Sequence, residues 1–201
     1  AQPEVLESSM AQWRRRLEPL PRPWITVLVG GNSSSYRLDP STARQLGQFT
    51  SRTARETGGS VLICTSPRTP ADAADAVLAA VEGPAYVYRW QSTNKDENPY
   101  LAYLALADRF IVTADSASML AEACCTGRPV ELFGCRRQRR QPKRLLRAFP
   151  ATQRFKEALI GWGIVKPKRD FQALHRELMK RGLLSSPGQK QPQQAAKPDD
   201  L

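Results

Sequence analysis

Histidine is almost absent from this chain of 201 residues, which contains only His175. A Ser-His-Asp triad and most zinc sites depend on histidine, and His175 falls on a late amphipathic segment away from the other polar motifs. The 4 cysteines show no C-x-x-C spacing. We therefore expect no metal site and no histidine-based nucleophile, and we expect the cysteines to be buried free thiols in a reducing compartment.

Long hydrophobic runs are also missing. No stretch approaches the roughly 20 consecutive apolar residues that a transmembrane helix needs. The chain begins at Ala1 without a methionine or a signal peptide, which indicates a processed or cut N-terminus. The expected location is the cytoplasm, with peripheral attachment to a membrane as an alternative.

Acidic residues are scarce relative to basic ones. The chain has 30 Lys and Arg against 19 Asp and Glu, a formal net charge of +11. This balance implies an anionic partner, which could be nucleic acid, a membrane surface or a phosphorylated ligand. Basic charge is densest in one run, namely Arg136, Arg137, Arg139, Arg140, Lys143, Arg144 and Arg147. That run contains no aromatic residue for base stacking, so nucleic acid is the weakest alternative, and a solvated surface or an anionic lipid surface fits better.

The regular alternation of apolar runs and helical segments predicts the fold class. Strands are expected at Trp24–Val29, Val61–Cys64, Tyr86–Trp90, Phe110–Thr113 and Val130–Phe133. Helices and short loops separate these runs. This pattern predicts an α/β fold, a Rossmann-like parallel sheet with helices on both faces.

The same pattern divides the chain into four parts. Residues 1–23 form an N-terminal, linker-like helix, and residues 24–135 form the Rossmann-like domain. Residues 136–184 carry the basic run and two C-terminal amphipathic helices, Arg154 to Ile160 and Asp170 to Leu184. Residues 185–201 are rich in Pro, Gln, Ser and Lys and are expected to be disordered.

The most informative stretch follows the strand at Phe110–Thr113. Asp115 and Ser116 can each cap the helix that we expect from Ala117 to Thr126, which Gly127 ends. Free N–H groups and the helix dipole make this helix start a ready anion site, with Ser116, Ser118 and Met119 around it. Glu122 lies one turn after Ser118, where it can accept hydrogen bonds from ribose hydroxyls. The alternative is an ordinary packed crossover with a capped end.

Two further loops leave the same edge of the predicted sheet. Gly30, Gly31, Asn32 and Ser33 follow the first strand, where glycines permit close approach of a ligand and polar groups supply donors. The third glycine of the dinucleotide fingerprint is missing. Thr65, Ser66 and Arg68 follow the second strand, and Thr69 is expected to cap the next helix. Arg68 could bind a phosphate or pair with a neighbouring carboxylate. Because ligands of open α/β sheets bind at this edge, its loops form the candidate site.

Four motifs, GGNSSSY, TSPRTP, NPYLAYLALAD and VTADSASMLAEACCTGRPV, together resemble the Elm-type mitochondrial fission family. Its bacterial members are often labelled predicted nucleoside-diphosphate-sugar epimerases. The last motif also resembles the nucleotide-binding motif in the C-terminal domain of GT-B glycosyltransferases. The resemblance covers about Trp24 to Val165. An epimerase is disfavoured because the chain has no Tyr-x-x-x-Lys pair.

The resemblance implies a nucleoside-diphosphate or nucleotide-sugar ligand, with no other cofactor. Ser116 and Ser118 would meet the diphosphate, Glu122 would hold the ribose, and Gly31, Asn32 and Arg68 would approach from across the cleft. GT-B enzymes take their acceptor from an N-terminal domain, so we expect glycosyl transfer only when such a domain is present. The alternative is a non-catalytic module that docks on a membrane or a partner protein through its basic segment, since plant relatives are associated with recruiting a dynamin-like fission protein.

Overall fold

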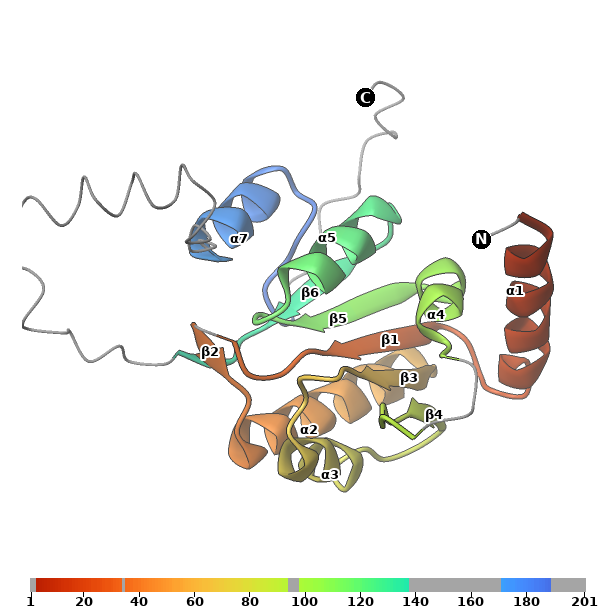
Figure 1. The fold of residues 1–201 in the computed structure, drawn as a ribbon, viewed down its shortest axis with the longest axis horizontal. Coiled ribbons are helices and arrows are strands. Elements are labelled where there is room, and N and C mark those ends of the chain that lie inside the picture. The colour runs from red at the N-terminus through yellow and green to blue at the C-terminus, as the bar shows by residue number, and fades with distance from the viewer. Residues whose placement is uncertain (1–2, 34, 94–97, 138–170, 189–201) are drawn as a thin grey trace, which may run out of the picture.

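The computed structural model describes residues 3–33, 35–93, 98–137 and 171–188. A five-stranded sheet forms the centre of the fold, with helices on both of its faces (Figure 1). Its strands are β1 (Trp24–Val29), β3 (Ser60–Thr65), β4 (Ala85–Tyr88), β5 (Arg109–Thr113) and β6 (Val130–Phe133). All five predicted strands are therefore found, within a few residues of the expected ends, and the predicted fold class is confirmed.

The strands run parallel in the order β4-β3-β1-β5-β6. From β1 the chain proceeds outward to β3 and β4, and it then crosses back to β5 on the other side of β1. The direction of winding therefore changes between β1 and β5. In open α/β sheets such a switch point leaves a crevice at the carboxyl ends of the strands.

The helices cover the two faces unequally (Figure 1). On one face lie α2 (Pro40–Thr57) and α3 (Ala71–Leu78), and on the other lie α1 (Pro3–Leu17), α4 (Tyr100–Leu106) and α5 (Ala117–Cys125). The Trp13 ring of α1 lies 5.8 Å from the Tyr86 ring and 6.1 Å from the Tyr103 ring, both in edge-to-face geometry. The N-terminal helix thus packs onto β4 and α4.

The central strands are buried throughout, which explains why their sequences are almost uninterrupted apolar runs. Every residue of β1 and β3 is buried, and Phe110, Ile111 and Val112 of β5 are fully inaccessible. Complete burial of such a side chain stabilises a protein by about 1.5–3 kcal/mol. The sheet therefore provides a rigid base for the loops at its carboxyl edge.

Helix ends agree only in part with the sequence predictions. Asp39 caps α2 by accepting the N–H of Thr42 at 2.8 Å, and Gly58 ends it at a φ of 68°, as predicted. The predicted cap at Thr69 is wrong, because Pro70 occupies the N-cap position of α3 and the Thr69 hydroxyl bonds instead to the carbonyl oxygens that end β1. Asp115 does not cap α5 either, since Ser116 stands at the N-cap position.

A small second sheet and a C-terminal segment complete the described structure. β2 (Tyr36–Arg37) pairs antiparallel with β7 (Arg136–Arg137), and α7 (Phe171–Lys180) follows later in the chain. Ser185 continues beside β6, donating its N–H to Val130 O at 3.0 Å and accepting the N–H of Leu132 at 2.9 Å. Residues 185–188, at the start of the predicted tail, are thus among the described residues, and residues 189–201 lie outside them. The basic run from Arg139 onward and the predicted helix at Arg154 to Ile160 lie outside the described residues.

The cysteines and the helices bear on two further expectations. Cys64, Cys124 and Cys135 are buried free thiols, whereas Cys125 is exposed, so the expectation of burial is wrong for that residue because it faces outward from α5. None of the described helices combines the length and apolar composition needed to cross a bilayer.

Candidate functional site

Asp115 is the point at which the loops of the carboxyl edge meet. Its side chain is fully buried, and its carboxylate accepts the backbone N–H of Gly31 at 2.6 Å. The Cys135 thiol donates to the other carboxylate oxygen at 3.7 Å, and Arg68 Nη2 lies 3.7 Å from Oδ2. Loops that follow β1, β3, β5 and β6 are thus joined through one carboxylate.

The environment of Asp115 opposes its ionisation. Burial raises the pKa of the Asp115 carboxyl above its ordinary value of 3.8, while the Gly31 N–H, the Thr113 hydroxyl and the Arg68 guanidinium act in the opposite direction. A buried carboxylate with these partners organises the edge. It has no exposed surface with which to meet a ligand.

The two glycines after β1 are required by the packing of the protein itself. A Cβ atom at Gly30 would lie 2.2 Å from Asp115 Oδ2, and a Cβ atom at Gly31 would lie 1.8 Å from the Arg68 carbonyl oxygen. Both spaces are already filled. The sequence analysis attributed these glycines to close approach by a ligand, and the structure provides an independent reason for them.

Several predicted ligand groups make hydrogen bonds inside the edge. Ser66 Oγ donates to Gly30 O at 3.0 Å, and Thr65 Oγ1 accepts the N–H of Trp90 at 2.8 Å. Asn32 Oδ1 accepts the N–H of Leu38 at 3.2 Å, and Ser33 Oγ accepts the N–H of Tyr36 at 3.1 Å. Thr65 and Ser66 are buried, so their hydroxyls stabilise the conformation of the loops.

Other groups at this edge remain open. The first hydrogen bond within α5 runs from Leu120 N to Ser116 O at 3.1 Å, and the Ser116 side chain makes no capping bond. The N–H groups of Ala117, Ser118 and Met119 therefore have no acceptor within the helix. Ser118 is exposed, and Met119 is half-buried against the core. An anion that reaches this helix end would meet unpaired donors and the positive end of the helix dipole.

Two charged side chains complete the open part of the site. The Arg68 side chain is 46% exposed, so it pairs with Asp115 from the surface and keeps a face available to solvent. Glu122 is exposed on α5 and accepts a hydrogen bond from the Tyr100 hydroxyl at 2.5 Å. The structure thus places Gly30, Gly31, Asn32, Ser33, Thr65, Ser66, Arg68, Asp115, Ser116 and the start of α5 at one edge, as the parallel sheet requires.

Tyr100 is the residue that sequence reasoning missed. It begins α4, and its N–H bonds to Asn98 Oδ1 at 3.0 Å. The sequence analysis used the Asn-Pro-Tyr stretch only as part of a family motif. Nothing in the local sequence showed that the tyrosine would reach a glutamate on the following helix.

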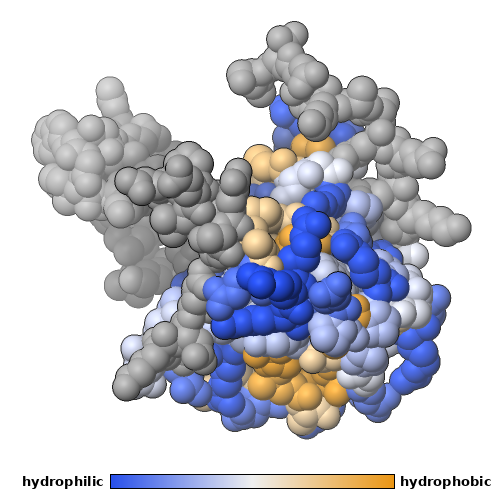
Figure 2. Space-filling view, turned by 90° about the vertical axis from the view of Figure 1, so that its right-hand side faces the viewer, coloured by the Kyte–Doolittle hydropathy of each residue, from blue (hydrophilic) through white to orange (hydrophobic). Residues whose placement is uncertain are grey.

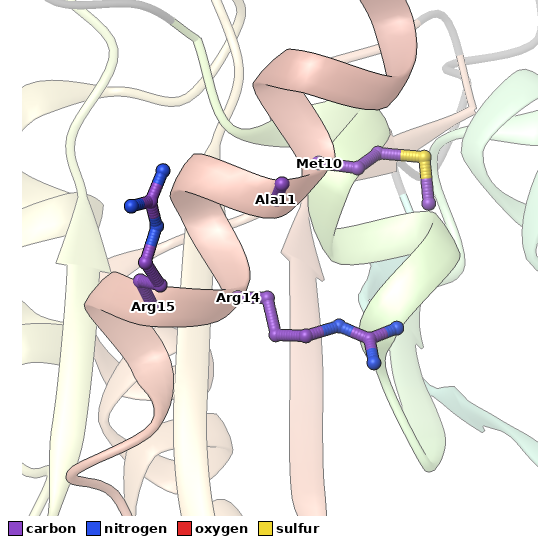
Figure 3. A pocket seen from close by; sticks show the side chains of 4 residues that line it. All are labelled: Met10, Ala11, Arg14 and Arg15. Atoms are coloured by element: carbon purple, nitrogen blue, oxygen red, sulfur yellow. The ribbon is translucent and has the colours of Figure 1, made fainter.

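A shallow hollow of about 460 Å³ lies away from this edge, on α1. Met10, Ala11, Arg14 and Arg15 line it, and the two arginine side chains extend in different directions along the helix (Figure 3). α1 lies beside the start of β1 (Figure 1). The side of the molecule on which it lies is mostly hydrophilic, and its most extensive hydrophobic patch lies at the bottom of the view (Figure 2). Within the described ranges, no three His, Cys, Asp or Glu side chains gather as a metal site.

The fold and its edge define a Rossmann-like α/β domain with a polar, partly open switch point between β1 and β5. The chain belongs to the mitochondrial fission ELM1 family, whose model matches residues 1–173. It is 35% identical over 129 residues to mitochondrial fission protein ELM1 of Arabidopsis thaliana and 27% identical over 107 residues to an uncharacterized protein of Rickettsia prowazekii. These matches cover 64% and 53% of this chain and 30% of each relative, so the chain spans less than a third of either protein.

Solved structures resemble the chain only weakly. A universal stress protein from Archaeoglobus fulgidus is 15% identical with a TM-score of 0.34, covering 60% of this chain and 98% of that one. An FMN-dependent cysteine decarboxylase, TvaF, is 18% identical with a TM-score of 0.35, covering 79% of this chain and 97% of that one. Likeness at this level bears on neither the fold nor the function.

Proposed function

We propose that the switch-point crevice binds a nucleoside diphosphate or nucleotide-sugar, as the C-terminal domain of a GT-B glycosyltransferase-like protein does. The observation that supports this most is the combination of an uncapped α5 N-terminus with an exposed carboxylate, Glu122, later on the same helix. Unpaired N–H groups at Ser118 and Met119 suit phosphate oxygens. Glu122 suits ribose hydroxyls, and Arg68 lies across the edge from the helix start.

The same arrangement supports binding without catalysis by this chain. Glycosyl transfer needs an acceptor held against the donor and a group that takes its proton. Asp115 is fully buried among its own partners, and His175 lies on α7 and is also buried. Glu122 is exposed on α5, and we assign its carboxylate to the ribose. A catalytic base and an acceptor site would therefore come from another domain.

Titration calorimetry with ADP, GDP, UDP and their sugar conjugates tests the proposal. Hydrogen bonds to charged groups contribute about 1.5–3 kcal/mol each, so Glu122→Ala should weaken the tightest of these ligands about tenfold or more. Glu82→Ala is the matched control, because Glu82 is an exposed glutamate that pairs with Arg55 on the opposite face of the sheet. Absence of binding to all of these ligands would contradict the proposed function. Equal affinity of wild type and Glu122→Ala would remove Glu122 from the ribose site.

A further inference from the structure

The hydrogen bond between Tyr100 and Glu122 links α4 to α5, two helices from different parts of the chain. The Tyr100 hydroxyl donates to Glu122 Oε2 at 2.5 Å, across 22 residues of sequence. We propose that Tyr100 is the positioning residue of this carboxylate and thereby sets the preference of the site for ribose hydroxyls. The inference rests on the proposed function, since it assigns a second residue to the same ribose subsite.

Tyr100 is held firmly enough to orient another side chain. It is the first residue of α4, its N–H is bonded to Asn98 Oδ1 at 3.0 Å, and its ring packs against the hydrophobic core. Burial raises the pKa of the Tyr100 hydroxyl, and the hydrogen bond to Glu122 raises it further. The phenol therefore stays protonated at neutral pH and remains a donor.

Glu122 needs such a partner because it is exposed and long. A free glutamate samples many rotamers, and fixing one on binding typically weakens affinity by about two- to tenfold. The Tyr100 bond restricts the carboxylate before any ligand arrives. It uses Oε2, and among the described residues no other hydrogen bond is made to Glu122, so Oε1 remains available as an acceptor for a ribose hydroxyl.

A bond of this kind could also serve only to brace α4 against α5. The two roles differ in what they discriminate. Loss of a brace lowers the folding stability and changes the affinity for all ligands alike. Loss of a positioning residue weakens the affinity only for ligands whose hydroxyls donate hydrogen bonds to Glu122.

The test therefore compares UDP with 2′,3′-dideoxy-UDP, and ADP with its dideoxy counterpart, on the full chain. Tyr100→Phe should weaken the ribonucleotide by about three- to tenfold and leave the dideoxynucleotide within about twofold of wild type. Tyr103→Phe is the matched control. It removes a hydroxyl from the same helix, and that hydroxyl is buried with no hydrogen-bond partner among the described residues. Binding of both nucleotides should be unchanged in that variant.

A double-mutant cycle adds a readout that a brace would not produce. If Tyr100 acts through Glu122, then Tyr100→Phe should have no further effect on ribonucleotide binding in the Glu122→Ala background. Additive losses in the cycle, or equal losses for ribo- and dideoxynucleotides, would overturn the positioning role while leaving the proposed function intact. If the wild-type chain binds neither nucleotide, the proposed function fails and this inference fails with it.

Discussion

Gly30 and Asp115 lie so close together that no side chain fits at position 30. A Cβ atom there would lie 2.2 Å from Asp115 Oδ2 and 2.7 Å from Cγ. The carboxylate cannot move aside freely, because it is buried and bonded to the Gly31 N–H. The buried carboxylate of Asp115, after β5, thus requires a glycine at position 30, after β1.

Gly30→Ala should therefore destabilise the fold. Overpacking of a filled interior typically costs about 1–3 kcal/mol, and urea unfolding should show a loss in this range. Gly134→Ala is the matched control, because nothing lies within 4 Å of a Cβ built at that position. An equal free energy of unfolding for Gly30→Ala and wild type would show that the packing around Asp115 adjusts to the added methyl group without loss of stability.

Asp115→Asn should change the pH dependence of stability. Burial raises the folded-state pKa of Asp115 above 3.8, so the folded state holds its proton more tightly than the unfolded state. The resulting stabilisation is fully present below 3.8 and is lost as the pH rises through the folded-state pKa. The advantage of wild type over Asp115→Asn should therefore shrink from acidic to neutral pH. Urea titrations of wild type and Asp115→Asn at several pH values measure this trend, and a constant difference between them would contradict the prediction.

The elements of this fold were predictable because their signals are local. A few neighbouring residues are enough to identify the apolar run of β1, the N-cap at Asp39 and the helix end at Gly58. The common edge of the loops followed from parallel strands alone. These signals fix where polar residues emerge from the sheet. They do not show what those residues contact.

The organisation of the site was not predictable, since its key bonds join distant segments. Asp115 bonds to Gly31 across 84 residues, and Tyr100 bonds to Glu122 across 22. A local reading assigned Asp115 to capping, because an aspartate before a helix usually caps it. The Ser66 hydroxyl donates to a backbone carbonyl of a neighbouring loop. Such internal hydrogen bonds depend on how closely the loops approach each other, which the local sequence does not show.

Glu131→Gln should loosen the C-terminal segment. Glu131 is 3% exposed in β6, where it pairs with Arg109 and accepts the N–H of Gly188 at 3.1 Å. Removing the charge weakens a buried pair, and the cost should reach up to about 3 kcal/mol. Hydrogen exchange should accelerate at Ser185 and Gly188 before it does in β1. Glu177→Gln, which disturbs an exposed pair on α7 with Arg181, should leave that exchange unchanged.

Arg68→Ala should weaken nucleotide binding while changing the free energy of unfolding little. The Arg68 side chain is 46% exposed and lies 3.7 Å from Asp115, so its ion pair is partly screened by solvent and should contribute no more than about 1 kcal/mol to folding. A diphosphate would gain far more from the same guanidinium, because charge-assisted bonds contribute about 1.5–3 kcal/mol each. The affinity for UDP or ADP should therefore fall about tenfold or more, while urea unfolding changes little.

The control for Arg68 is Arg55→Ala, which removes an exposed arginine of α2 that pairs with Glu82 at 2.8 Å. It should affect neither the nucleotide affinity nor the dependence of binding on salt. Binding through Arg68 should weaken as salt increases, and this sensitivity should diminish in Arg68→Ala. The opposite pattern, with unchanged affinity and a large loss of stability, would assign Arg68 to Asp115 alone and leave the phosphate to the α5 N-terminus.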